Sequence, residues 1–281
     1  MKPRIALVTD STCDLPDALV QERRLYVIPQ VILWGREVLK DGISFNSRQF
    51  YERLAVDPDM PTTSRPAPVD VVDLLQRARD ENDAEAVVVI IVSADVSGTV
   101  SSTQEAMKAV DFPVYMVDTR TISLALGLTV LQAADARDRG ASAPEVVDLA
   151  QRVAARSRVM FTPGTLEYLY RGGRIGGARH LIGTALSIKP ILHLKDGRVE
   201  ALESVRTRKR ALKRLVEILD EQIDRSRPMH IGVMHGNAAE EADALTAEIR
   251  ERLNPAVLLQ SWVSPSIGVH AGPGVIGLAM L

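Results

Sequence analysis

A run of seven apolar residues at positions 86–92 restricts the fold of this chain more than any other feature. The run is AVVVIIV, so it is β-branched at every position but the first and has no polar residue. Because neighbouring side chains of a strand point to opposite faces, both faces of this strand must be covered by other elements. The run therefore predicts the central strand of a parallel sheet with helices on both sides.

Shorter apolar runs and helical patterns alternate around this strand, as expected for successive strand–helix–strand units. We expect further strands at residues 5–9, 26–33 and 114–117. We expect helices at residues 70–80, 99–110, 122–139 and 144–156. The first part of the chain is thus predicted to be an α/β domain built on a parallel sheet.

The second part of the chain has a different pattern. Residues 190–205 form two alternating runs joined by Asp196-Gly197, which is typical of a β-hairpin. Helices are expected at 208–224 and 238–253, and strands at 229–234 and 257–262. These elements predict a mixed sheet, and the whole chain is interpreted as a two-domain α/β protein with domains at 1–158 and 159–281.

Composition excludes several classes of protein. The 34 basic residues nearly balance the 36 acidic ones, and aromatic residues make up only 4%, which argues against nucleic acid as a partner. A single cysteine, Cys13, allows no internal disulfide, and the five histidines lack the spacing of a metal site, so no metal or cofactor is expected. No apolar run approaches the ~20 residues of an integral membrane segment. The expected location is the cytoplasm.

Three hydroxyl residues, Thr62, Thr63 and Ser64, stand between prolines in residues 60–68. Proline fixes the backbone angle φ, so this segment is expected to be stiff and extended and able to hold a hydroxyl in place. An ordinary loop leading into a helix is the alternative interpretation.

A second group of hydroxyls follows the central strand. Ser97, Gly98 and Thr99 lie where that strand ends and the next helix begins. Open α/β sheets bind ligands at this edge, and the free N–H groups of a helix N-terminus favour an anion. Ser97 could instead serve only to cap the helix.

Arginines mark two other segments. The glycine-rich residues 170–178 include Arg174 but lack the Gly-Lys-Ser/Thr ending of a nucleotide-binding loop, so no ATP site is indicated. Farther on, basic residues recur at helical spacing and predict a basic helix face, either solvated or facing an acidic partner. These are Arg206, Lys209, Arg210, Lys213 and Arg214.

Taken in order, six short motifs resemble those of the DegV family, the fatty-acid-binding subunits of bacterial fatty acid kinase. They are residues 9–15 (TDSTCDL), 62–66 (TTSRP), 97–99 (SGT), 173–175 (GRI), 205–207 (VRT) and 267–274 (IGVHAGPG). Each motif is weak alone, but together they span the chain in the right order.

The resemblance implies a protein without catalytic residues or cofactor of its own, which holds one long-chain, palmitate-like fatty acid in an apolar tunnel. It implies that Thr63, Ser97 and His270 bind the carboxylate, supported by Thr62, Ser64, Gly98 and Thr99. It further implies an ATP-binding kinase subunit as partner, met through Arg174 and Arg206, which forms an acyl phosphate. A downstream acyltransferase involved in phospholipid metabolism would then use this product.

Two positions depart from the family pattern, since Arg65 stands where glutamine is common and Val269 where a small hydroxyl residue is frequent.

Two other functions remain compatible with the residues. Ser97 as nucleophile with His270 as base would make the chain a hydrolase of small esters, although no acid to orient the histidine is identifiable. A regulatory module that binds another carboxylate would use the same polar residues as the fatty-acid carrier.

Overall fold

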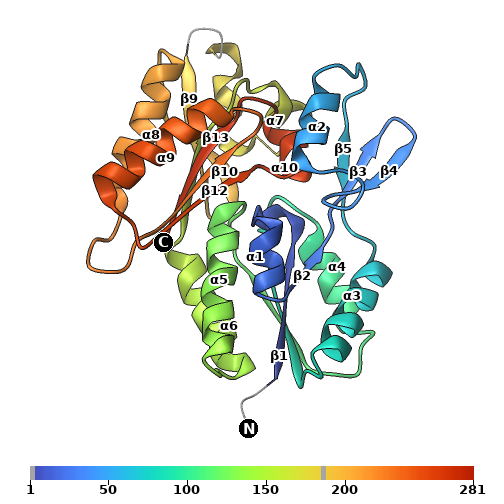
Figure 1. Ribbon diagram of the computed structural model, residues 1–281. Coiled ribbons are helices and arrows are strands. Elements are labelled where there is room, and N and C mark those ends of the chain that lie inside the picture. Colours follow the sequence, from blue (N-terminus) through green and yellow to red (C-terminus); the bar gives the residue numbers. More distant parts are fainter. Residues whose placement is uncertain (1–3, 185–187) are drawn as a thin grey trace.

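The computed structural model describes residues 4–184 and 188–281 and contains two large sheets and one small sheet (Figure 1). The first large sheet is parallel throughout, which confirms the predicted parallel sheet. Its strands in spatial order are β2 (Leu25–Ile28), β1 (Ile5–Asp10), β6 (Ala86–Ile91) and β7 (Val114–Asp118). All six residues of β6 are buried, as its composition requires.

Helices cover both faces of this sheet. Val87, Val89 and Ile91 of β6 pack with helices on one face, whereas Val88 and Ile90 pack with helices on the other. The first face carries α3 (Pro68–Glu81) and α4 (Thr99–Met107). The second carries α5 (Leu124–Asp138) and α6 (Ala143–Arg156).

Most element boundaries differ from the sequence-based expectation by no more than three residues, and two of the differences have a clear physical cause. The run expected as one strand at 26–33 is broken at Pro29 and Gln30, and its second half, β3 (Val31–Trp34), joins a different sheet. Proline has no N–H to continue the ladder, so the chain leaves the first sheet there. The helix expected from residue 122 begins at Leu124, because Ser123 has a φ of 59° and a ψ of −146°, outside the helical region.

The small sheet is antiparallel and includes the hydroxyl residues 62–64 as one of its strands. Its strands in spatial order are β4 (Glu37–Lys40), β3 and β5 (Thr62–Ser64). Helix α2 (Ser47–Leu54) packs against it through an aromatic cluster that includes Trp34 and Phe50. Val269 lies in the same cluster. The proline-flanked hydroxyls lie on the strand β5, so the segment is extended there, as predicted.

The second large sheet is mixed, as predicted, with only β11 and β12 parallel. Its strands in spatial order are β10 (Arg198–Val205), β9 (Lys189–Lys195), β8 (Arg158–Thr162), β13 (Ile276–Met280), β11 (His230–His235) and β12 (Val257–Trp262). The predicted hairpin turn has positive φ at both Asp196 and Gly197, as a type I′ turn requires.

Helices α8 (Arg208–Gln222) and α9 (Ala239–Leu253) cover one face of this second sheet. The remaining elements are short. They are η1 (Ser11–Cys13), α1 (Asp17–Glu22), α7 (Glu167–Arg171), η2 (Gly176–Thr184) and α10 (Pro265–Ala271).

Helix α5 joins the two large sheets. It contacts β1 and β6 of the first sheet and β8, β11 and β13 of the second. One apolar cluster consequently extends from Val88 and Leu124 to Val159, Met234 and Ala279. The cluster crosses the proposed division of the chain between residues 158 and 159, which stays a prediction.

Replacing Gly232 with alanine should destabilise the protein by about 1–3 kcal/mol, because a Cβ there would lie 2.7 Å from Cβ of Leu124 and push α5 away from β11. Urea unfolding of the variant measures this loss. Gly183→Ala is the matched control, since a Cβ at that position meets no atom within 4 Å. Equal stability of the two variants would show that α5 tolerates displacement.

Candidate functional site

A partly open cavity extends into the apolar cluster between the two large sheets. Its volume is about 110 Å³, counted as the space open to the centre of a water-sized sphere, which is roughly eight times what one water molecule needs. The wall is mainly aliphatic. Its apolar residues are Val92, Val96, Ile122, Val159, Phe161, Leu169, Leu194, Val199, Met234, Val263, Ile267, Ala271 and Val275.

Most of the sequence-predicted polar residues lie on this wall. Of the proposed carboxylate-binding and supporting residues, Thr63, Ser64, Ser97, Gly98 and His270 line the cavity, and so does Arg174. They come from β5, the loop before α4, the last turn of α10 and the loop after α7. The fold thus brings together groups that are far apart in the sequence.

Thr63 and His270 are in direct contact. The hydroxyl oxygen of Thr63 lies 2.8 Å from Nε2 of the imidazole, so the two groups share a hydrogen bond. Thr63 stands in the middle of β5, paired with the buried Ile32, and this pairing directs it toward the interior.

His270 is held neutral. Burial, together with the positive charge of Arg174, lowers the imidazole pKa to about 3. No group among the described residues hydrogen-bonds to its Nδ1, which packs against Gly172, where a Cβ would lie only 2.1 Å away. Glycine at 172 is therefore required for the position of this ring.

Ser97 lies just before Gly98, the N-cap residue of α4, and faces the cavity. Its oxygen accepts the N–H of Thr99 at 3.3 Å and lies 2.8 Å from the Thr99 hydroxyl. The Thr99 oxygen in turn accepts the side-chain amide of Gln30 at 2.7 Å. Ser97 is therefore not the N-cap residue that the alternative interpretation assumed, although its oxygen accepts the N–H of the first helical residue.

The two arginines at the cavity differ in how their charge is neutralised. Arg65 forms an ion pair with Glu105 at 3.0 Å, and its aliphatic stem packs over Gly98. Arg174 donates to the carbonyls of Val96 at 3.3 Å and Gly172 at 2.8 Å, and no carboxylate pairs with it among residues 4–184 and 188–281. Its positive charge is thus uncompensated beside the imidazole.

Three other predicted residues lie off the cavity wall. Thr62 is exposed and pairs with the partly exposed Leu33, whereas Thr99 is buried behind Ser97. Arg206 is exposed at the end of β10, and no hydrogen bond or ion pair involves it within the described part of the chain. Val269 packs into the aromatic cluster of the small sheet rather than into the cavity.

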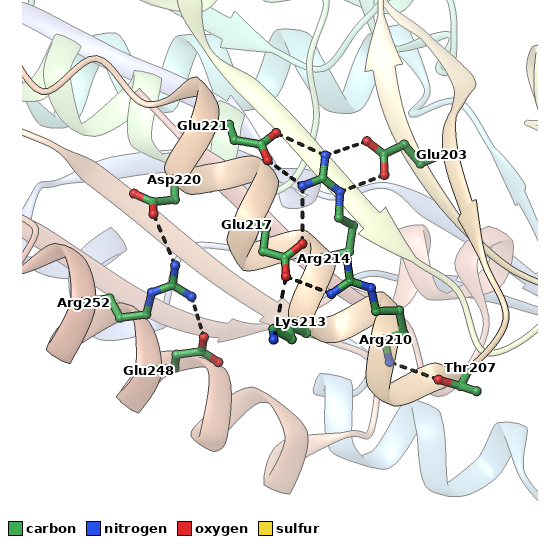
Figure 2. A network of polar contacts seen from close by, with 10 residues as sticks. All are labelled: Glu203, Thr207, Arg210, Lys213, Arg214, Glu217, Asp220, Glu221, Glu248 and Arg252. Carbon is green, nitrogen blue, oxygen red and sulfur yellow. Dashed lines mark hydrogen bonds and ion pairs between the residues drawn. The ribbon is translucent and has the colours of Figure 1, made fainter.

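The predicted basic face of α8 is solvated but largely neutralised by ion pairs. Figure 2 shows that Arg214 is bound by Glu203, Glu217 and Glu221, and that Glu217 also pairs with Arg210. Glu217 and Glu221 lie one or two turns farther along the same helix and Glu203 lies on β10. Together they neutralise Arg210 and Arg214. The face is a mixed ion-pair network rather than a positive surface.

Several polar residues of the wall carried no recognisable signal in the sequence. They are Thr12, Gln30, Ser123 and Ser266. Thr12 lies in the 9–15 motif and Ser266 directly precedes the 267–274 motif, but neither position was singled out, and Gln30 and Ser123 belong to no motif. They reach the cavity only through the three-dimensional arrangement.

The 9–15 motif contains two buried carboxylates, Asp10 and Asp14, and a third, that of Asp41, bonds to Ser11 of the same motif. Asp10 accepts N–H groups from Thr12 at 2.9 Å and Val92 at 2.8 Å, which ties the ends of β1 and β6 together. Asp14 accepts the N–H of Ser264 at 2.9 Å and the hydroxyl of Ser123. Burial raises the pKa of all three, to about 7 for Asp14 and about 6 for Asp41.

The hydrolase arrangement is not formed. Ser97 contacts Thr99 rather than His270, and within the described part of the chain no carboxylate bonds to Nδ1 of His270 to orient the ring for catalysis. Among the described residues there is also no group of three or more histidine, cysteine or acidic side chains that could hold a metal ion. No helix in residues 4–184 or 188–281 is long and apolar enough to cross a membrane.

A two-sheet α/β fold around an apolar cavity with a polar end defines a protein that can enclose a small molecule with an apolar body and a polar head. The chain belongs to the DegV family, because the model of that family, described as an uncharacterised protein, matches residues 4–281.

Related proteins are similar in sequence to this chain along almost its whole length. A DegV domain-containing protein of Streptomyces coelicolor is 37% identical over 281 residues, covering 100% of this chain and 99% of the relative. The DegV protein of Bacillus subtilis is 34% identical over 276 residues, covering 98% of each. Solved structures of a fatty acid binding DegV family protein from Thermus thermophilus and of DegV, a fatty acid binding protein from B. subtilis, each have a TM-score of 0.91, 32% identity and 99% coverage of both chains.

Replacing Asp14 with asparagine should make stability less dependent on pH. The unfolded carboxyl titrates near pH 4 and the folded one near 7, so between these values the native state keeps a proton that the unfolded state has lost. This group therefore makes the wild type less stable as pH rises, by at most about 1.4 kcal/mol per pH unit.

The unfolding free energy of Asp14→Asn minus that of wild type should accordingly rise from pH 4.5 to pH 7 and then level off. Urea unfolding at several pH values measures this difference, in which the other titrating groups cancel. Asp17→Asn, an exposed carboxyl on α1, is the control. A difference that does not change with pH would contradict the buried, protonated state of Asp14.

Proposed function

We propose that this protein binds one long-chain fatty acid, with its chain in the apolar cavity and its carboxylate at Thr63, Ser97 and His270. The observation that carries the proposal is the charge of the cavity wall. Two arginines line it and no aspartate or glutamate does, within the described residues, so an apolar ligand with an anionic head suits it. The relatives described as fatty acid binding proteins support the same conclusion.

The apolar wall accounts for affinity. At ~0.8 kcal/mol per buried methylene, a sixteen-carbon chain contributes on the order of 10 kcal/mol before the costs of association. The polar groups then determine which end of the ligand lies where, since a buried carboxylate without donors is strongly unfavourable.

The head group would be bound by hydroxyl donors and one cation. If the imidazole carries its proton on Nε2, His270 donates to the Thr63 oxygen and leaves the Thr63 hydroxyl proton for the carboxylate. The Ser97 hydroxyl supplies a second donor, and Arg174 supplies positive charge without an ion-pair partner of its own. A neutral histidine in this position orients the threonine rather than forming an ion pair.

We further propose that the bound carboxylate is presented to an ATP-dependent kinase subunit. A carboxylate oxygen would attack the γ-phosphorus of ATP, ADP would leave, and an acyl phosphate would remain for a downstream acyltransferase. Because the glycine-rich residues 170–178 lack the Gly-Lys-Ser/Thr ending of an ATP-binding loop, we assign ATP to the partner and the role of non-catalytic carrier to this chain. Both proteins would act in the cytoplasm. Arg174 at the cavity and the exposed Arg206 would stabilise the transferring phosphoryl group or the contact with the partner.

Protein purified from a bacterial host should contain close to one fatty acid per chain, and Thr63→Val should lower fatty-acid affinity at least tenfold. The substitution keeps the shape of the side chain but removes the donor to the carboxylate. Mass spectrometry of an organic extract and a fluorescent fatty-acid titration provide the two measurements. Thr62→Val, on the exposed side of the same strand, should bind normally. An extract without fatty acid would count against the proposal.

Arg206→Ala should lower acyl phosphate formation at least tenfold while leaving fatty-acid affinity unchanged, because Arg206 lies outside the cavity wall. Hydroxylamine trapping of the acyl phosphate, with ATP and the kinase subunit present, measures the rate. Lys209→Ala, an exposed cation three residues along the chain, is the control. Loss of fatty-acid binding in Arg206→Ala would contradict the proposed role of this residue outside the binding site.

A further inference from the structure

The 9–15 motif and the residues around it lie at the opposite end of α10 from His270. Helix α10 has only seven residues, and its N-cap Ser264 makes no side-chain cap bond. A helix this short is marginal on its own, so external contacts must fix its position. Two buried carboxylates from the first part of the chain make those contacts.

Asp41 is the more central of the two. Its Oδ2 accepts both the N–H of Ser266, at 3.2 Å, and the hydroxyl of the same residue. Asp14 accepts the N–H of Ser264 at 2.9 Å. The first turn of α10 is therefore held at two backbone donors, and its last turn carries His270 opposite Thr63.

The same oxygen of Asp41 also supports the Ser97 side of the site. It accepts the Ser11 hydroxyl at 2.9 Å, and the Ser11 oxygen accepts the N–H of Gln30 at 3.1 Å. The backbone N–H of Asp41 donates to the Gln30 carbonyl at 2.9 Å. The Gln30 side chain then reaches Thr99, which contacts Ser97.

We propose that Asp41 is the positioning residue of the head-group site, because its carboxylate joins the helix that carries His270 to the hydrogen-bonded chain that ends at Ser97. It touches no ligand in this role. The inference rests on the proposed function for what the site binds, but the positioning itself can be tested in the ligand-free protein.

The chemistry of the position agrees with this role. Asp41 is 3% exposed, and no cation pairs with it in the described part of the chain, so its carboxyl adds little favourable charge interaction. What it supplies is an oxygen that accepts three donors from two segments. Asparagine can supply the same oxygen, whereas alanine cannot.

The experiment compares Asp41→Ala with Asp41→Asn. We expect Asp41→Ala to lower fatty-acid affinity at least tenfold and Asp41→Asn to stay within about threefold of wild type. In the ligand-free proteins, NMR titration of the His270 ring gives a second readout. We expect its pKa to rise by at least about one unit in Asp41→Ala and to stay near the wild-type value in Asp41→Asn, because a displaced ring gains water.

A matched control separates positioning from general stability. Leu215→Ala removes apolar contacts in the core beneath α8 and should lower stability. Since Leu215 is not part of the cavity wall, both readouts should stay unchanged in the folded protein. If Asp41→Ala does not fold, Ser11→Ala removes only the side-chain link between Asp41 and Gln30, keeps the backbone link, and should weaken binding about threefold. Normal binding by that variant would then contradict the proposal.

The outcomes are distinct for the two proposals. A folded Asp41→Ala protein with wild-type affinity and an unchanged His270 titration would overturn the positioning role. If wild type itself binds no fatty acid, the proposed function fails, whereas the His270 titration still decides whether Asp41 positions the ring.

Discussion

The close packing of α5 against β11 is the contact on which the rest of the structure depends. Gly232 has no side chain, so Leu124 at the start of α5 lies directly on the second sheet, and the two sheets share one apolar cluster. Protein interiors rarely contain voids much larger than one water molecule. A cavity of about 110 Å³ inside this cluster is therefore an incomplete core, and an acyl chain would complete it. In the proposed function, ligand binding and core packing are the same interaction.

The polar end of the cavity depends on a different set of contacts. Thr63, Ser97, Arg174 and His270 come from four segments, and none of these segments alone could fix the distance between its side chain and the others. Gly172 allows the ring of His270 to approach, and Gln30 fixes the Thr99 hydroxyl behind Ser97. The site therefore needs buried hydrogen bonds in addition to apolar packing, because packing has little directionality.

The sequence predicted those features that depend on local pattern. The apolar run at 86–92 indicated a strand buried on both faces, Asp196-Gly197 indicated the hairpin, and the hydroxyls at 62–64 and 97–99 supplied residues of the cavity wall. Features that depend on distant contacts were not predictable. Gln30 belongs to no pattern, and Glu203, one of the residues that neutralise Arg214 of α8, lies on another element. Only the fold brings these groups together.

The charges at the head group also explain why a neutral histidine and an unpaired arginine occur side by side. Burial and Arg174 keep His270 uncharged across the physiological range, so the site has one fixed positive charge that does not vary with pH. One carboxylate neutralises that charge. An acyl phosphate carries more negative charge than the carboxylate from which it forms, so the product of the proposed reaction exceeds what Arg174 alone can balance. The additional charge must then be met by solvent or by cations outside the cavity, such as the exposed Arg206. In the proposed function, the site would thus match the substrate rather than the product, and this difference would favour transfer of the phosphorylated head to the next protein.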